Sequence, residues 1–154
     1  KLAFLGDGNN VAHSLLYGCA KVGIHLSLAV PEGYEPKAEV LEQARKDAEA
    51  TGAKLEVTRD IETALEGADA VYTDVWASMG QESEKEARAR VMKPYQLNSR
   101  ALAMAKKDAI VLHCLPAHRG EEITDEVIDG PQSVVFDQAE NRLHAQMGFL
   151  LMAL

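Results

Sequence analysis

Short apolar segments alternate with helical patterns along the whole chain, and this alternation constrains the fold more than any other feature. Segments typical of strands, each bounded by glycine, proline or polar turn residues, cover residues 1–5, 25–30, 54–58, 70–73 and 109–113, with a shorter sixth at 134–136. Helical patterns lie at 11–22, 37–50 and 61–65, and a last helix starts at about residue 138. We therefore expect an α/β fold in a single domain, residues 1–154, with a doubly wound, Rossmann-like parallel sheet and helices on both faces.

The composition argues against several classes of protein. Acidic residues outnumber basic ones by 24 to 16, and the resulting net charge of -8 disfavours nucleic acid or an anionic membrane as the main partner. No apolar run reaches the roughly 18 residues that a membrane span requires. The two cysteines are far apart in the sequence and form no CxxC pair, which disfavours a disulfide scaffold and indicates a reducing, cytoplasmic location.

In sheets of this kind ligands bind beyond the carboxyl ends of the strands, so the residues that follow each strand matter most. After the first strand comes Gly6-Asp7-Gly8-Asn9-Asn10. This segment partly matches a dinucleotide fingerprint, but Val11 replaces the third glycine. The alternatives are a tight turn in which Asn9 or Asn10 caps the next helix, and a small-ligand site in which the two amides bind a carboxylate.

A second polar cluster, Asp74, Ser78 and Met79, follows the fourth strand. A carboxylate beside a hydroxyl suits an ammonium group, whereas main-chain N–H groups in such a loop suit an anion. The alternative is a plain loop with a helix cap ahead of the acidic run that starts at Glu82. We expect Trp76, between these residues, to pack against the protein.

The third cluster, His113-Cys114-Leu115-Pro116, follows the fifth strand. A cysteine at the end of a strand is expected to face the crevice, whereas Cys19, inside the first helix, is expected to be buried. His113, Cys114 and His118 match no standard zinc spacing, so no metal is expected. The alternative role is a nucleophilic Cys–His pair, although neighbouring residues on a strand point to opposite faces.

The last helix carries two further features. Arg142 either pairs with a nearby acid such as Glu140 or is aimed at an anion, where its planar fork fits phosphate or carboxylate. An apolar stripe recurs at helical spacing: Leu143, Met147, Leu150, Leu151 and Leu154. We expect this stripe to pack on the sheet, and the alternative is that it docks on a neighbouring domain.

Together these segments resemble the ornithine-binding half of the ornithine carbamoyltransferases, within the aspartate/ornithine carbamoyltransferase family. The resemblance rests on four motifs in the family's order: Gly6-Asp7-Gly8-Asn9-Asn10, Asp74-x-x-x-Ser78-Met79-Gly80, His113-Cys114-Leu115-Pro116 and Ala139-Glu140-Asn141-Arg142. The family's second domain is a doubly wound sheet, which agrees with the fold expected above. Its amino-terminal domain binds carbamoyl phosphate through a Ser-Thr-Arg-Thr-Arg signature that this sequence lacks. We therefore expect residues 1–154 to be the ornithine-binding domain of a longer protein.

The resemblance implies a role in binding L-ornithine for each matching residue. Asn10, together with Asn9, would bind the α-carboxylate, helped by the main chain at Met79. Asp74 and Ser78 would hold the α-ammonium group.

The remaining matches imply the reacting end of the site. Cys114 and the Leu115 carbonyl would lie beside the side-chain amine, and Cys114, Leu115 and Arg142 would contact carbamoyl phosphate. Cys114 and Asp74 would be the catalytic residues. The neutral amine would attack the carbamoyl carbon, with phosphate as the leaving group, to give L-citrulline.

No cofactor or metal is implied by this chemistry. The resemblance also implies a homo-trimer, or a multiple of one, for the full-length enzyme, while the chain without the amino-terminal domain is expected to be inactive. Two alternatives remain. One is a non-catalytic, nucleotide-binding Rossmann module, and the other is a carbamoyltransferase for a related amine such as putrescine or acetylornithine.

Overall fold

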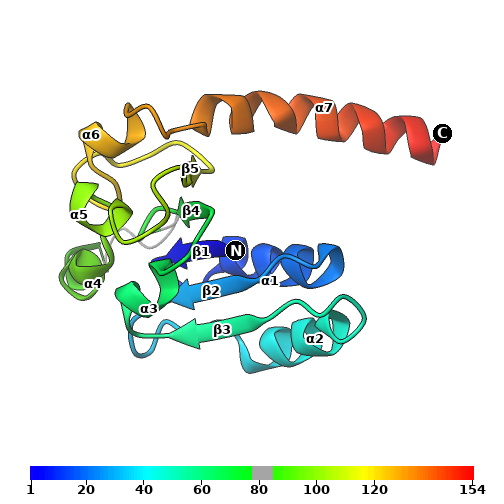
Figure 1. Cartoon of the computed structure of the whole chain (residues 1–154), viewed down its shortest axis with the longest axis horizontal. Helices are drawn as coiled ribbons and strands as arrows, with labels where there is room; N and C mark the ends of the chain where they lie inside the picture. Colours follow the sequence, from blue (N-terminus) through cyan, green and yellow to red (C-terminus); the bar gives the residue numbers. More distant parts are fainter. Residues whose placement is uncertain (78–84) are drawn as a thin grey trace.

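The chain folds around one parallel sheet of five strands (Figure 1). The computed structural model describes residues 1–77 and 85–154. The strand order is β3-β2-β1-β4-β5, and all pairings are parallel. The strands are β1 Leu2–Leu5, β2 Leu26–Ala29, β3 Leu55–Thr58, β4 Ala70–Thr73 and β5 Ile110–His113. The five longer segments expected to be strands are thereby confirmed.

Helices join these strands and also follow the last of them. They are α1 Asn10–Val22, α2 Ala38–Ala48, α3 Ile61–Leu65, α4 Lys85–Met92, η2 Lys93–Tyr95, α5 Ser99–Leu102, α6 Asp125–Ile128 and α7 Val135–Ala153. The helices expected at 11–22, 37–50 and 61–65 are confirmed to within a few residues. The helices between 85 and 102 and at 125–128 were not expected, since they are short or carry weak apolar periodicity.

The order in which the chain adds strands to the sheet reverses beside β1, and this reversal creates the place for a site. Leu2–Leu5 pairs with β2 on one side and with β4 on the other. The chain therefore runs outward from β1 through β2 to β3, then crosses back to β4 and β5. Such a switch point leaves a crevice beyond the carboxyl ends of the two strands that flank it. The loops after β1, β4 and β5 all reach this edge.

Helices cover both faces of the sheet, as expected, because the central strand is apolar on both sides. Leu2 and Phe4 pack with side chains of α1 and α2, including Leu16. Ala3 and Leu5 face the opposite cluster, built from α3, α5 and α6. Full burial of a side chain such as Leu16 contributes about 1.5–3 kcal/mol. These two cores fix β1 in the middle of the sheet.

The expectation of a sixth strand at residues 134–136 is wrong. The Val111 N–H donates to the Gln132 carbonyl (2.8 Å), and the Val134 N–H donates to the Val111 carbonyl (3.1 Å). The pairing ends after this isolated bridge, and α7 begins at Val135. Val135 is buried in the core while Phe136 is 70% exposed. Three apolar residues in a row do not distinguish a short strand from the first turn of a helix.

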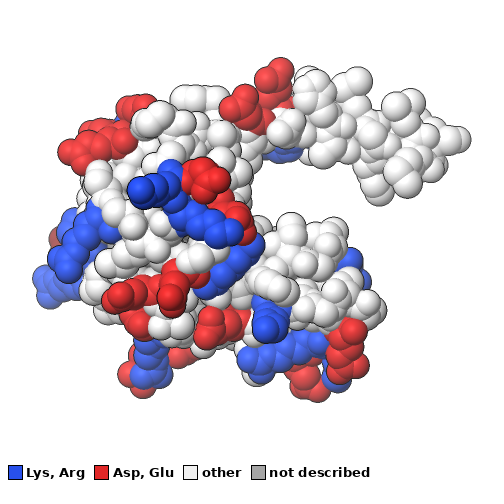
Figure 2. Space-filling view, in the orientation of Figure 1, with Lys and Arg blue, Asp and Glu red and all other residues white. Residues whose placement is uncertain are grey.

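The expectation that the last helix packs on the sheet is also wrong. Along α7 only Val135, at its start, is buried. The helix extends away from the sheet and ends free in Figure 1, and Figure 2 shows it as an arm almost without charge beyond its base. The expected stripe is exposed at every position: Leu143, Met147, Leu150, Leu151 and Leu154. None of the helices in the described part of the chain has the length and apolarity needed to cross a membrane.

Gly8 illustrates how packing explains a motif glycine. Its N–H donates to the Tyr34 carbonyl at 2.8 Å. A Cβ at this position would lie 2.5 Å from that oxygen and 2.7 Å from the carbonyl carbon of Glu35, both backbone atoms. The glycine therefore admits the loop after β2 close to the loop after β1, and this contact accounts for it without a bound nucleotide.

We predict that Gly8→Ala lowers the free energy of unfolding by about 1–3 kcal/mol, because the new methyl group meets backbone that cannot rotate away. Gly18→Ala is the matched control. Gly18 lies exposed within α1 with no atom near its missing Cβ, so alanine there should stabilise the protein by about 0.5–1 kcal/mol. Urea unfolding of both variants measures the difference. Equal shifts in the two variants would contradict the proposed contact.

Candidate functional site

Asp74 lies where the loops after β1, β4 and β5 meet. Its carboxylate is buried and, among the described residues, accepts hydrogen bonds from three groups, two of which are distant in the sequence. Asn9 Nδ2 donates to Oδ2 at 3.0 Å, the Cys114 thiol donates to Oδ1 at 2.9 Å, and the Val75 N–H donates to Oδ1 at 2.8 Å. The three polar clusters of the sequence therefore converge on one carboxylate, as expected for residues that follow strands flanking a switch point.

Asn9 and Asn10 have different environments: Asn9 caps a helix, whereas Asn10 faces a cavity. The Asn9 side-chain oxygen accepts hydrogen bonds from the N–H groups of Val11 (3.0 Å) and Ala12 (3.3 Å), and thus caps α1. Its amide nitrogen donates to Asp74. Both ends of the Asn9 side chain are thereby occupied by the protein. Asn10 is exposed at the start of α1 and lines a cavity, which leaves its amide able to meet a ligand.

The Cys114 thiol is held in its neutral form. The residue is exposed at the end of β5, as expected, but its sulfur turns toward Asp74. Loss of water around the sulfur, followed by the adjacent Asp74 carboxylate, raises the pKa of Cys114 to about 12. A thiol with this pKa is a poor nucleophile at neutral pH. The neighbouring His113 is buried and bonded elsewhere, so the structure does not support a Cys–His nucleophile.

Two hollows meet at the segment of residues 114–116. A cavity of about 520 Å³ is lined by this segment together with Asn10, Asp74 and His118. A second cavity, of about 720 Å³, is lined by the same segment together with Tyr72, Gln138 and Arg142, among others. Cys114 therefore lies in the wall between a hollow that contains an acid and one that contains an arginine.

Leu115 has an unusual backbone conformation within this wall. It is the one non-glycine residue with positive φ in the described part of the chain, at 53°. A left-handed conformation costs a residue with a Cβ roughly 1–2 kcal/mol. The following peptide bond to Pro116 is cis. The strain of the left-handed Leu115 backbone persists only where surrounding contacts hold it, and such strain is concentrated at functional sites.

The other residues expected at the site have different outcomes. Arg142 is exposed on α7 and lines the cavity of about 720 Å³. Trp76 is buried, as expected, and Cys19 is buried inside α1. Ser78 and Met79 lie outside the described residues.

Two pairs beside the site were missed by the sequence reasoning. Arg88 Nη1 donates to Asp7 Oδ2 at 2.7 Å, and the guanidinium stacks over the Tyr34 ring at 5.0 Å. Burial raises the pKa of Asp7 despite this arginine. Gln138 Nε2 donates to the Tyr72 hydroxyl at 3.0 Å. The members of these pairs are 81 and 66 residues apart, and no local motif predicts such contacts.

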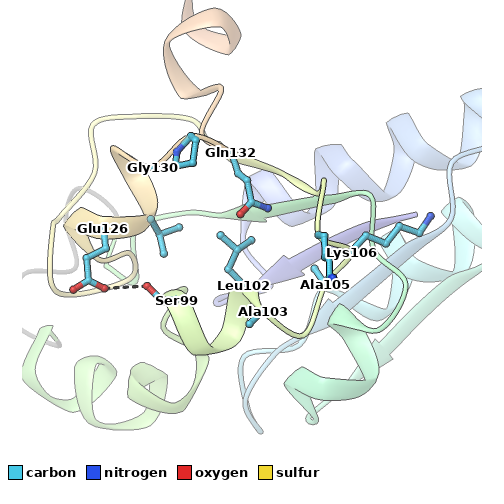
Figure 3. Close-up of a pocket in the computed structure, with 11 residues that line it drawn as sticks. Ser99, Leu102, Ala103, Ala105, Lys106, Glu126, Gly130 and Gln132 are labelled. Carbon is cyan, nitrogen blue, oxygen red and sulfur yellow. Dashed lines mark hydrogen bonds between the residues drawn. The ribbon is translucent and has the colours of Figure 1, made fainter.

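A further hollow, of about 420 Å³, lies away from this edge of the sheet, between α5, α6 and the segment before α7 (Figure 3). Four of its polar lining side chains, those of Ser99, Lys106, Glu126 and Gln132, bond to the protein itself. Ser99 donates to Glu126 at 2.9 Å, Gln132 donates to the Ala109 carbonyl, and Lys106 pairs with Asp69. With most of its polar side chains engaged in this way, the hollow is a weaker ligand site than the crevice around Asp74.

One group of side chains in the described ranges has metal-ligand chemistry. It consists of His118, Glu121 and Glu122, whose ligand atoms lie within 4.8 Å of one another. Glu122 Oε1 already accepts hydrogen bonds from the His118 N–H and from the His113 ring. These internal bonds engage Oε1 of the buried carboxylate in the protein itself.

An open parallel sheet with polar side chains converging at its switch point defines a small-molecule-binding α/β domain. Comparison with known proteins identifies its family. Residues 1–153 match the family described as "Aspartate/ornithine carbamoyltransferase, Asp/Orn binding domain". The chain therefore belongs to the aspartate/ornithine carbamoyltransferase family, and it carries the Asp/Orn binding domain.

Individual relatives agree with this assignment. Ornithine carbamoyltransferase of Geobacillus stearothermophilus is 57% identical over 154 residues, which are 100% of this chain and 50% of the relative. The structure of ornithine carbamoyltransferase from Pyrococcus furiosus superposes with a TM-score of 0.92 at 52% identity, covering 97% of this chain and 48% of that one. An N-acetyl-L-ornithine transcarbamylase structure gives a TM-score of 0.81 at 30% identity, covering 95% and 47%. The chain thus spans about half the length of these relatives.

We predict that Asp74→Asn speeds alkylation of Cys114 by iodoacetamide at pH 8. Removing the carboxylate removes a charge that disfavours the thiolate, so the thiol pKa should fall from about 12 toward its ordinary value. The rate should rise by roughly threefold for each unit of that fall, because a less basic thiolate is also less nucleophilic. Mass spectrometry of the Cys114 peptide measures the rate.

Glu62→Gln, which removes an exposed carboxylate on α3, is the charge-matched control and should leave the rate unchanged. Equal rates in Asp74→Asn and the unmodified chain would show that the thiol is not controlled by Asp74.

Proposed function

We propose that residues 1–154 form the ornithine-binding domain of an ornithine carbamoyltransferase. The complete enzyme would transfer the carbamoyl group of carbamoyl phosphate to the side-chain amine of L-ornithine, giving L-citrulline and phosphate. The observation that carries this proposal is the buried Asp74 carboxylate at the switch point, with the thiol of Cys114 bonded to it at 2.9 Å. The names of the relatives support the same reaction.

Recognition of the α groups follows from charge. Asp74 supplies the negative charge for the α-ammonium group, and we assign the Ser78 hydroxyl to the same group. Asn10 and the main chain at Met79 supply donors for the α-carboxylate. Asn9 acts through Asp74, because its amide holds Oδ2 at 3.0 Å while its oxygen caps α1. Hydrogen bonds to charged groups are worth about 1.5–3 kcal/mol each, enough to fix the substrate's orientation.

The reacting amine lies at the wall formed by Cys114 and Leu115. Only the neutral amine is a nucleophile, and an alkylamine with a pKa of about 10.4 is almost fully protonated at pH 7. A desolvated site disfavours the ammonium form and so promotes loss of its proton. The neutral Cys114 thiol and the Leu115 carbonyl orient the amine without forming a covalent bond. The lone pair then attacks the carbamoyl carbon, and phosphate departs.

Carbamoyl phosphate is held partly from outside this domain. Arg142 lines the hollow on the far side of Cys114, and its guanidinium fits the phosphate of this substrate. Most of the donors that stabilise the developing charge belong to the amino-terminal domain. We therefore propose that the domain alone is inactive.

We further propose that the amino-terminal domain packs on the exposed face of α7. This face offers a row of apolar side chains that are 52–103% exposed, from Leu143 to Leu154. A patch of this kind marks an interaction site. Trimeric assembly of the complete enzyme and a cytoplasmic location belong to the same proposal. The free thiols of Cys19 and Cys114 agree with a reducing compartment.

The alternatives fit the site less well. A nucleotide-binding role needs a free turn after β1, but Asn9 is occupied by capping and by Asp74. Acetylornithine has no α-ammonium charge to match Asp74, and the N-acetyl-L-ornithine transcarbamylase neighbour is 30% identical, against 52% for the Pyrococcus ornithine enzyme. Putrescine lacks the α-carboxylate that Asn10 would bind.

The function is tested by complementation. The purified chain should form no citrulline from ornithine and carbamoyl phosphate, because the groups that grip carbamoyl phosphate lie elsewhere. Addition of the amino-terminal half of the Geobacillus relative should produce citrulline. Parallel assays with putrescine and acetylornithine test the substrate. Citrulline from the chain alone would contradict the division of labour, and binding of a nucleotide without norvaline binding would favour the alternative class.

Asp74→Asn in the complemented enzyme should weaken norvaline binding by about 2 kcal/mol, roughly 30-fold, because norvaline keeps both α groups of ornithine but lacks its amine. Cys114→Ala should instead lower turnover more than norvaline affinity, since the thiol faces the amine. Calorimetry and steady-state rates separate the two effects. Unchanged norvaline affinity in Asp74→Asn would remove Asp74 from the site.

Leu151→Asn should weaken association with the amino-terminal half by about tenfold or more, because a buried leucine contributes about 1.5–3 kcal/mol. Val22→Asn, at an equally apolar and 69% exposed position on α1, is the matched control. Titration of citrulline formation against the added half measures the affinity. If both variants behave like the unmodified chain, α7 is not the docking face.

A further inference from the structure

A buried pair, His113 and Glu122, lies behind the wall that carries Cys114 and Leu115. Both side chains are 0% exposed, and His113 Nε2 lies 3.1 Å from Glu122 Oε1. Neither side chain takes part in the reaction proposed for this site. A buried ionisable pair without contact to solvent needs a structural or functional reason, because burial of such groups is costly.

The hydrogen bonds fix which ring nitrogen of His113 carries the proton. The Leu115 N–H donates to Nδ1 at 2.8 Å, so Nδ1 bears no hydrogen and acts as an acceptor. The proton of a neutral imidazole must then be on Nε2, from which it is donated to Glu122 Oε1. The Glu122 carboxyl group therefore selects the tautomer of His113, and this tautomer accepts the hydrogen bond from the Leu115 N–H.

Glu122 also binds the other end of the same segment. The His118 N–H donates to the same Oε1 atom at 2.6 Å. Residues 113 to 118 are therefore held at both ends by one carboxyl oxygen. Between these ends lie Cys114 and Leu115, with the positive φ of 53° at Leu115. The N–H of this strained residue is the donor to the His113 ring.

We propose that Glu122 and His113 are positioning residues for carbamoyl transfer, which hold the strained turn so that the Cys114 thiol and the Leu115 carbonyl face the reacting amine. This role rests on the proposed function, because it concerns the geometry of that reaction. Neither side chain touches substrate. Without the acceptor at Nδ1, the partly buried Leu115 N–H would be unpaired, and the turn would be free to relax to an ordinary conformation.

Two isosteres of His113 separate this role from simple packing. In His113→Asn the amide oxygen stands close to the position of Nδ1 and still accepts from Leu115, but no donor from this side chain reaches Glu122. In His113→Gln the amide nitrogen reaches toward Glu122, but no acceptor faces Leu115. The proposal expects turnover of the complemented enzyme to follow the Leu115 bond. His113→Gln should lose roughly 100-fold in kcat, the order expected for a displacement of about 1 Å, while the KM for ornithine changes much less. His113→Asn should retain at least about ten times more activity.

Glu122 has a corresponding conservative variant. Both donors use Oε1, and Oε2 has no partner among the described residues, so Glu122→Gln keeps the acceptor and should retain most of the turnover. Glu122→Leu removes it and should behave like His113→Gln. Glu121→Gln, at the adjacent and partly exposed position, is the control. Unfolding midpoints of every variant identify any that fail to fold.

A spectroscopic measurement on the chain alone tests the bond pattern without relying on activity. Nitrogen-15 NMR at pH 7 should show His113 with a bare Nδ1 and a protonated Nε2. The opposite tautomer, or equal turnover of His113→Asn and His113→Gln in folded enzymes, would overturn the positioning role. An unmodified assembly that makes no citrulline would overturn the proposed function and this role with it, while the tautomer would still report whether the turn is held as described.

Discussion

The Asp74 carboxylate joins parts of the chain that the sheet alone only brings near each other. Parallel pairing puts the ends of β1, β4 and β5 on one edge, but the loops that follow have no ladder to hold them. One buried anion accepts from Asn9, from Cys114 and from its own neighbour Val75. A buried charge satisfied in this way is costly to disturb, since loss of any donor leaves it less well compensated. The geometry of the crevice therefore depends on this carboxylate before any ligand arrives.

Much of the fold could be predicted from the sequence because it depends on local patterns. The fully buried β1 is a continuous apolar run, and the buried residues of α1 recur at helical spacing: Ala12, Leu16, Cys19 and Ala20. The two errors have one cause. The run Val134-Val135-Phe136 and the α7 stripe are apolar, and apolarity predicts burial without saying against what. Val135 is buried in this chain, whereas Leu151 is 81% exposed.

The candidate site divides in the same way. Position after a strand was enough to predict that Asp74, Asn10 and Cys114 lie together at one edge of the sheet, because the topology rule depends only on strand order. The same rule could not predict that Asn9 both caps α1 and binds Asp74. It also could not predict the Asp7–Arg88 pair, whose members are 81 residues apart. The tautomer of His113 is even harder to predict from the sequence, because it depends on a backbone N–H two residues away and a carboxyl group nine residues away. Such details follow only from three-dimensional contacts.

The projecting α7 has a mechanical consequence. Its 19 residues form a rod of about 28 Å, which is rooted at the crevice. Near that root, Gln138 accepts from the backbone N–H of His113 and donates to the Tyr72 hydroxyl, both at 3.0 Å. For a stiff rod of that length, a tilt of about 5° at the root moves the far end by roughly 2.5 Å. A partner bound to the far end of α7 would therefore also control the position of Gln138, which is part of the wall of the cavity of about 720 Å³.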